Sequence, residues 1–274
     1  FGTRDDFMNP VLCALQEPDI RPEVGLACQA AYKGMVEHTD GLVGRVRRAF
    51  SAFVGGRGTP HLFGYLSDHG DTIGEHGVFG KKTFFEKSVK IPLLLAGTGV
   101  AAGRRWDEPV SILDVGPTVC AWAGAETPER ADGQSLASIL RGEDGPRGRA
   151  VLSESMDKGP DGRWTYGCMA RRGTYKFITY HGYESQDMLF DVAADPLEQN
   201  NLAAARPGMC EEFRWLLRQA TDPAAAEALQ AQHTKRARVL AAFEKQTGYD
   251  DRERYRDYPE EAKRPPEVCV TSLV

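Results

Sequence analysis

The sequence predicts an α/β fold in which a doubly wound sheet is followed by a small C-terminal antiparallel subdomain and a helical tail. Up to about residue 145, apolar strand-like runs alternate with helical patterns, as in doubly wound sheets. Beyond that point, short β-rich runs follow one another at hairpin spacing. The expected parts are an α/β part at 1–149, an antiparallel sheet at 150–207 and a helical tail at 208–274.

Glycine and proline delimit the elements of the α/β part. Three prolines make residues 1–24 irregular. Apolar residues at a period close to 3.6 then predict a long helix, which a glycine cluster at 55–58 ends. The expected elements, in order, are a helix at 24–53, a buried strand at 61–66, an apolar strand at 91–96 whose Pro92 suits an edge position, and helices at 112–123 and 135–140.

The second half of the chain reads as a small sheet with helices after it. Alternating β-branched and aromatic residues indicate the strands, and Gly248 is a natural stop for the last helix. Charge and proline make 249–274 a loose or wrapping arm. The expected elements are strands at 151–154, 164–171, 175–180 and 188–192, and helices at 211–220 and 223–247.

The loop at 67–82 carries the strongest chemical signal. It follows an apolar run directly, and the end of a strand is where open α/β sheets place ligands. Asp68 and His69 are adjacent there, and a carboxylate beside an imidazole supplies two metal ligands. Lys81 adds a positive charge thirteen positions later. A cation together with a lysine would suit a small dianion such as sulfate or phosphate.

Composition excludes several classes of function. The 274 residues are 41% hydrophobic and 27% charged, with a net charge of −5, so no broad attraction to nucleic acid is indicated. No apolar run approaches the roughly 20 residues of a membrane span. The six cysteines are scattered without a CxxC pair, which argues against a zinc knuckle and predicts no disulfide framework.

Four segments, in this order, resemble motifs of the sulfatases, which belong to the alkaline phosphatase superfamily. The longest runs from Ser67-Asp-His-Gly-Asp to Ile91-Pro-Leu-Leu-Leu. It is followed by Val110-Ser-Ile-Leu-Asp-Val-Gly-Pro-Thr-Val, Asp132-Gly-Gln-Ser-Leu and Met188-Leu-Phe-Asp-Val-Ala-Ala-Asp-Pro-Leu-Glu-Gln-Asn-Asn-Leu. The resemblance covers residues 25–205 and implies an alkaline-phosphatase-like sheet, represented here in part.

The resemblance also implies a site. Asp68 and His69 would hold one divalent cation, and Lys81 would bind the substrate's sulfate. Calcium is the usual metal of the family, frequently beside Asn where His69 stands, so manganese, magnesium and zinc stay open. The family's nucleophile is a formylglycine made from Cys or Ser in C/S-x-P/A-x-R, and this motif is absent before Asp68. We therefore expect the chain to be a C-terminal portion whose partner is the missing N-terminal half.

Three other residues that could take part in chemistry also have structural interpretations. Cys168-Met-Ala-Arg-Arg matches C-x-A-x-R, but it lies after the metal loop and within an expected strand, where no helix N-terminus could assist an anion. His76 is a weak catalytic candidate, equally well explained as a loop histidine. Asp114 precedes a helix and is expected to be its N-cap.

Three functions remain open at this point. The first is a sulfatase acting on a small-molecule or saccharide sulfate ester, with this fragment inactive alone. The second is a phosphonate monoester or phosphodiester hydrolase of the same superfamily. The third is a non-catalytic truncated paralogue. The substrate, the oligomeric state and the compartment, cytoplasmic or exported, are not determined.

Overall fold

The computed structural model describes residues 21–81, 83–158 and 164–247. The predicted irregular start, apart from 21–24, and the predicted arm at 249–274 with the stop at Gly248 lie outside these residues. The chain forms two compact units, residues 1–227 and 228–274. All elements up to α6 belong to the first unit.

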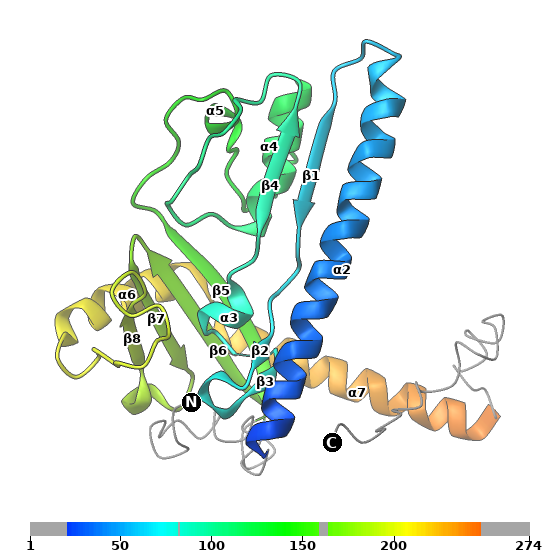
Figure 1. Cartoon of the computed structure of the whole chain (residues 1–274). Helices are drawn as coiled ribbons and strands as arrows, with labels where there is room; N and C mark the ends of the chain where they lie inside the picture. Colours follow the sequence, from blue (N-terminus) through cyan, green and yellow to red (C-terminus); the bar gives the residue numbers. More distant parts are fainter. Residues whose placement is uncertain (1–20, 82, 159–163, 248–274) are drawn as a thin grey trace. The chain divides into compact units, whose positions relative to one another are not determined.

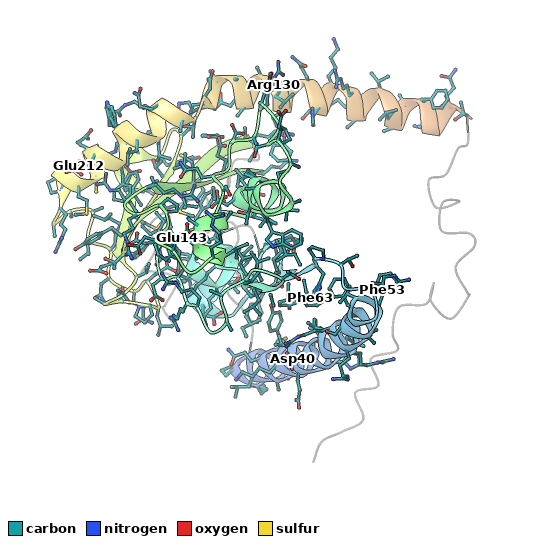
Figure 2. All side chains as sticks on the ribbon, turned by 90° about the horizontal axis from the view of Figure 1, so that it is seen from above. Asp40, Phe53, Phe63, Arg130, Glu143 and Glu212 are labelled. Atoms are coloured by element: carbon teal, nitrogen blue, oxygen red, sulfur yellow. The ribbon has the colours of Figure 1, made fainter. Side chains whose placement is uncertain are left out.

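The first element is a long helix, α2 (Pro22–Gly55), shown in blue in Figure 1. It begins two residues earlier than predicted because Pro22 occupies its first turn, where no backbone N–H is required. Only Gly25 and Val54 of this helix are buried. Figure 2 shows most of its side chains, Asp40 and Phe53 among them, projecting from the helix surface. The apolar period therefore predicted the helix correctly, although the described residues cover little of its apolar face.

Two strands of the α/β part pair with each other. β1 (Leu62–Leu66) and β4 (Leu93–Gly97) lie side by side and run antiparallel, with Leu62 opposite Gly97 (Figure 1). The prediction of a doubly wound, parallel sheet is not confirmed within the described residues. Both strands are also only half-buried, although a buried strand was expected at 61–66.

Short elements connect and follow this pair. Between the strands lie a small hairpin, a 3₁₀ turn and one helical turn. A second 3₁₀ turn and two further helices follow β4. Their bounds are β2 (Thr72–Ile73), η2 (Glu75–Gly77), β3 (Phe79–Gly80), α3 (Glu86–Val89), η3 (Ile112–Asp114), α4 (Val115–Ala123) and α5 (Ala137–Leu140).

The predicted antiparallel sheet is confirmed. Its four strands are paired in sequence order, β5-β6-β7-β8, each antiparallel to the next. Helix α6 (Pro207–Ala220) follows, and α7 (Pro223–Thr247) continues into the second unit. The remaining bounds are β5 (Ala150–Lys158), β6 (Trp164–Arg172), β7 (Tyr175–Tyr180), η4 (Glu184–Gln186) and β8 (Met188–Asp191).

The core lies on the two faces of this sheet. One cluster joins Phe84 and Phe85 to Met169, Ile178 and Phe190, and so fixes the segment around α3 to the sheet. The other cluster joins the opposite face to α6. Among the described residues, no helix combines the length and apolarity needed to cross a membrane.

Candidate active site at the Asp68–His69 loop

The loop after β1 turns sharply because its polar groups bond to one another. The Ser67 hydroxyl donates to the His69 carbonyl oxygen at 2.8 Å, and the His69 N–H donates to Asp68 Oδ1 at 3.0 Å. The hydrogen bond from the His69 N–H stabilises the carboxylate and so holds the pKa of Asp68 below its ordinary value. Asp68 is therefore an anion with its other oxygen available.

Gly70 places this turn against α3. Its N–H donates to the Ser88 carbonyl at 2.7 Å. A Cβ added at Gly70 would lie 2.1 Å from the Lys87 carbonyl oxygen, far inside contact distance. Only glycine allows this approach, so the Asp-His-Gly string has a steric reason for its last residue.

Both ring nitrogens of His69 have partners. Nδ1 lies 2.9 Å from the Gly70 carbonyl oxygen, which can only accept, so Nδ1 carries the hydrogen. Nε2 then has a free lone pair, and the Lys81 ammonium donates to it at 2.9 Å. Asp68 Oδ2 lies 3.5 Å from the same Nε2. The three predicted site residues therefore meet at one point.

These three side chains also share a cavity of about 430 Å³. Its walls come from three regions: the α3 segment, the loop before η3, and residues of β5 and β6. The residues from these walls are Thr83, Phe84, Ser88, Val89, Ile91, Val110, Ser111, Ile112, Val151, Leu152, Ser153, Glu154, Ser155 and Met169. A cavity with a largely apolar lining and a few charged groups is a common form of small-molecule site.

His76 lies elsewhere and does not line this cavity. Its side chain is buried and stacks on Phe85, with ring centroids 3.8 Å apart, and its backbone has a φ of 56°. Burial lowers the pKa of His76 to about 4, so the ring is neutral near pH 7. These contacts favour the interpretation as a packed loop histidine.

The chemistry of the donor set fits a divalent cation. Cations of this kind bind oxygen and nitrogen ligands at about 2.0–2.6 Å, so donors 3.5 Å apart can both bind one ion. The Nδ1–H bond to the Gly70 carbonyl fixes the ring orientation and leaves Nε2 as the atom that can bind a metal. Within the described ranges, no third His, Cys, Asp or Glu completes the set. Asp68 and His69 would therefore supply only part of the coordination shell.

The structure opposes a nucleophilic role for Cys168. The thiol is buried within β6, between two paired strands, and burial raises its pKa to about 12. A thiol held protonated is a poor nucleophile.

Asp114 occupies the N-cap position of α4, as the sequence suggested, but its side chain makes no cap hydrogen bond to that helix. Ser111 is the N-cap of η3, and Asp114 is the third residue of a capping box whose carboxylate accepts the Ser111 N–H at 2.8 Å. The same carboxylate accepts the Gln134 N–H at 2.8 Å and pairs with Arg149. It therefore joins three segments of chain.

Sequence reasoning missed a buried charge cluster beneath α3. Glu86, Arg171, Lys176 and Glu198 form it, and Lys176 is completely buried. Glu86 and Glu198 belong to two of the quoted motifs. The charged residues in those motifs are visible in the sequence. Which of them form ion pairs over such long separations cannot be predicted from a single sequence.

Comparison with known proteins identifies the family of this chain. A family model described as "N-sulphoglucosamine sulphohydrolase, C-terminal" matches residues 74–211. The chain belongs to the sulfatase family. It corresponds to the C-terminal portion of these proteins.

Individual sulfatases and related hydrolases are similar over longer stretches. Arylsulfatase K of Danio rerio is 33% identical over 71% of this chain and 37% of its own length. Choline-sulfatase of Rhizobium meliloti is 34% identical over 70% of this chain and 36% of its own. The chain therefore spans about a third of the length of these sulfatase relatives.

Solved structures show the same fold. Phosphonate monoester hydrolase from Silicibacter pomeroyi matches with a TM-score of 0.66 and 25% identity, over 80% of this chain and 49% of that one. A 2-O GAG sulfatase matches with a TM-score of 0.52 and 31% identity, over 58% and 35%. The α/β fold with its small antiparallel sheet is thus that of the sulfatases and their phosphonate-hydrolysing relatives.

Proposed function

We propose that this chain supplies part of the cation site and the sulfate-binding lysine of a sulfate-ester hydrolase. The observation that supports it is the meeting of Asp68, His69 and Lys81 in the wall of one shared cavity. Membership of the sulfatase family gives that meeting a chemical purpose.

Each of the three residues has a distinct part in this proposal. Asp68 and His69 Nε2 would hold the cation, with calcium preferred over manganese, magnesium or zinc. The cation supplies positive charge next to the oxygens of the ester. Lys81 would then exchange its bond to His69 Nε2 for one to a nonbridging sulfate oxygen, where its charge stabilises the negative charge that develops during hydrolysis.

The nucleophile would come from outside this chain. We expect a formylglycine from a Cys or Ser in C/S-x-P/A-x-R, carried by the N-terminal half with which this chain would assemble. Cys168 does not serve, because its thiol is buried and protonated. We therefore expect negligible turnover by the purified 274-residue chain, and robust sulfatase activity from that chain alone would overturn this expectation.

Sulfate is preferred to phosphonate or phosphodiester as the substrate class. The three sulfatases named above are 31–34% identical, whereas the phosphonate monoester hydrolases are 25% identical. The phosphonate monoester hydrolases do have the higher TM-scores, which keeps them as the second candidate. Whether the ester's alcohol is a small molecule or a saccharide is not part of the proposal.

The experiment begins with the DNA upstream of Phe1. If an in-frame C/S-x-P/A-x-R is found there, the joined protein is assayed with aryl sulfate and aryl phosphodiester side by side. Faster turnover of the sulfate is expected, and comparable rates on both would remove the preference for sulfate. A stop codon directly upstream would instead favour a non-catalytic paralogue.

Variants of the joined protein test the named residues. Replacing Lys81 by Ala should lower kcat/KM by about 100-fold or more, the usual effect of losing one charge-stabilising donor. The matched control is Lys87→Ala, since Lys87 is exposed and its nearest acidic partner, Glu75, is 4.0 Å away. Equal losses in the two variants would contradict a specific role for Lys81.

Removal of the cation tests the other two residues. Chelation should abolish the activity of the joined protein, and added Ca²⁺ should restore it. Asp68→Asn should weaken Ca²⁺ binding in calorimetric titration as well as activity, because it removes the negative charge from the ligand. Unchanged Ca²⁺ affinity in this variant would remove Asp68 from the metal shell.

A further inference from the structure

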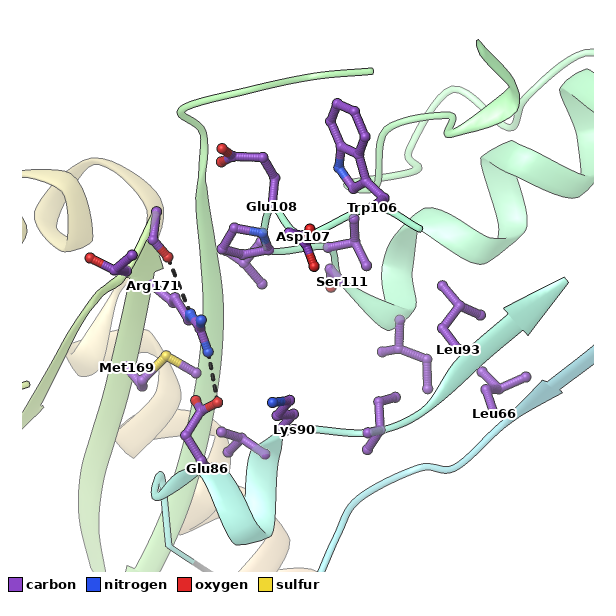
Figure 3. A pocket seen from close by; sticks show the side chains of 18 of the residues that line it. Leu66, Glu86, Lys90, Leu93, Trp106, Asp107, Glu108, Ser111, Met169 and Arg171 are labelled. Atoms are coloured by element: carbon purple, nitrogen blue, oxygen red, sulfur yellow. Dashed lines mark hydrogen bonds and ion pairs between the residues drawn. The ribbon is translucent and has the colours of Figure 1, made fainter. Parts of the chain in front are cut away.

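The buried charge cluster joins the α3 segment to the four-stranded sheet and to the segment that follows this sheet. Glu86, at the start of α3, bonds through Oε2 to Arg171 Nη1 at 2.7 Å and through Oε1 to Lys176 Nζ at 3.1 Å. Lys176 also pairs with Glu198. Figure 3 shows Arg171 on β6 reaching Glu86 across the wall of a neighbouring cavity. The cluster holds two cations and two anions, so it is formally neutral.

Burial makes this cluster sensitive to the loss of any member. The side chains of Lys176 and Glu198 are 0% and 2% exposed. Burial alone would raise the pKa of Glu86, but Lys176 and Arg171 bring that pKa below its ordinary value. An ion left without its partner at such a site is strongly destabilising, whereas a complete pair is tolerated.

A continuous series of short bonds leads from this cluster to His69. Glu198 accepts the Glu86 N–H at 2.6 Å, at the first residue of α3. At the other end of α3, the Ser88 carbonyl accepts the Gly70 N–H at 2.7 Å. The Gly70 carbonyl in turn lies 2.9 Å from His69 Nδ1. The four residues of α3 are thus fixed on one side by the cluster and fix the Asp-His-Gly turn on the other.

We infer that Lys176 is a positioning residue for the Asp68–His69 site, acting through Glu86, α3 and Gly70. This inference rests on the proposed function for the importance of that site, but the coupling itself is a property of the fold. It also connects two of the motif segments that are far apart in sequence, because Glu86 and Glu198 contribute the anions that meet Arg171 and Lys176 here.

A simpler explanation is that the aromatic anchors suffice. Phe84 and Phe85 directly precede Glu86 and pack in the core, so they could hold α3 without the charges. The two explanations differ in what happens to Gly70 when Lys176 loses its charge. Only the positioning role predicts that the Gly70 N–H loses its hydrogen bond while the β1–β4 pair stays intact.

Residue-resolved amide hydrogen exchange of the 274-residue chain, read by mass spectrometry at low concentration, separates them. In Lys176→Met, the Gly70 amide should exchange about tenfold faster or more, while the β1–β4 amides keep their protection. The matched control is Arg172→Met, which removes a neighbouring basic residue whose partner, Glu212, is largely exposed. It should leave Gly70 unchanged.

Every other outcome decides the question as well. Unchanged Gly70 exchange in Lys176→Met would overturn the inference. If that variant loses protection everywhere, the charge-balanced double variant Lys176→Met/Glu198→Gln is measured instead. Faster exchange at the Gly70 amide with protected β1–β4 amides would support the positioning role. Equally faster exchange at Gly70 and at the β1–β4 amides would overturn it. Because the measurement involves neither turnover nor a metal, a joined enzyme without sulfatase activity would refute the proposed function and leave this coupling standing.

Discussion

His69 has one defined tautomer in this fold because both of its nitrogens have fixed partners. A carbonyl oxygen holds the hydrogen on Nδ1, and Nε2 faces Asp68 and Lys81. The adjacent glycine makes this possible by letting the backbone approach α3. At the scale of single residues, the Asp-His-Gly string is therefore a unit in which two residues carry the chemistry and the third carries the geometry.

Gly70→Ala tests that geometry. The added Cβ would lie 2.1 Å from the Lys87 carbonyl oxygen, so the loop or α3 must shift, at a cost of about 1–3 kcal/mol in unfolding free energy. Urea unfolding measures it. The matched control is Gly34→Ala on α2, where a Cβ meets nothing within 4 Å and should stabilise the helix by about 0.5–1 kcal/mol. A neutral Gly70→Ala would contradict the close approach.

His76 makes stability depend on pH. Its folded pKa of about 4 is below the ordinary 6.5, so the unfolded chain binds a proton that the folded chain does not. The stabilisation is complete above pH 6.5 and is lost as the pH falls toward 4, by up to about 3 kcal/mol.

The check on this pH dependence is a comparison of variants. His76→Asn cannot titrate in this range, and asparagine tolerates the positive φ of 56°. The difference in unfolding free energy between the two proteins should therefore shrink between pH 6.5 and 4. A difference that stays constant would show that His76 is not held neutral.

At the scale of elements, short segments depend on polar contacts made by residues outside them. α3 has four residues and η3 has three, too few to be stable by their own hydrogen bonds. Glu198 and Gly70 hold the first; Asp114, through Ser111, Gln134 and Arg149, holds the second. Contacts with buried carboxylates thus stabilise helices that are too short to be stable by themselves.

Asp114→Asn tests this for η3 and α4. The amide keeps the size of the carboxylate but leaves Arg149 unpaired at a site where Asp114 is 0% exposed. We expect a loss of about 3–5 kcal/mol in urea unfolding, the cost of breaking a buried pair. Asp107→Asn breaks an exposed pair with Arg105 and should leave the unfolding midpoint unchanged. Similar midpoints for both variants would contradict the structural role.

At the scale of the whole molecule, apolar surface remains open. In the described residues β1 and β4 pair only with each other, and Leu26, Met35 and Leu94 are 62%, 60% and 63% exposed. Open strand edges and apolar patches of this kind favour association.

The purified chain should therefore associate with itself as its concentration rises and should have low stability alone. Light scattering after size-exclusion chromatography measures the first property, and thermal unfolding measures the second. A soluble monomer at all concentrations, with a sharp cooperative transition, would contradict both expectations.

The sequence by itself determined the elements with strong local signals and the residues of the candidate site. The 3.6 period predicted α2, hairpin spacing predicted β5 to β8, and the order of motifs predicted the sulfatase family. It also singled out Asp68, His69 and Lys81, because adjacent ligands and a nearby lysine are visible in a single string. Each of these features can be recognised from residues that are close together in the sequence.

Only the tertiary structure decided the rest. It showed that β1 and β4 run antiparallel, since strand direction depends on the path of the chain between them. It showed that Asp114 joins three segments, and that Lys176 pairs with Glu86 and Glu198. These pairs are separated by 90 and 22 positions, and one sequence carries no information about which distant charges will meet once water is excluded.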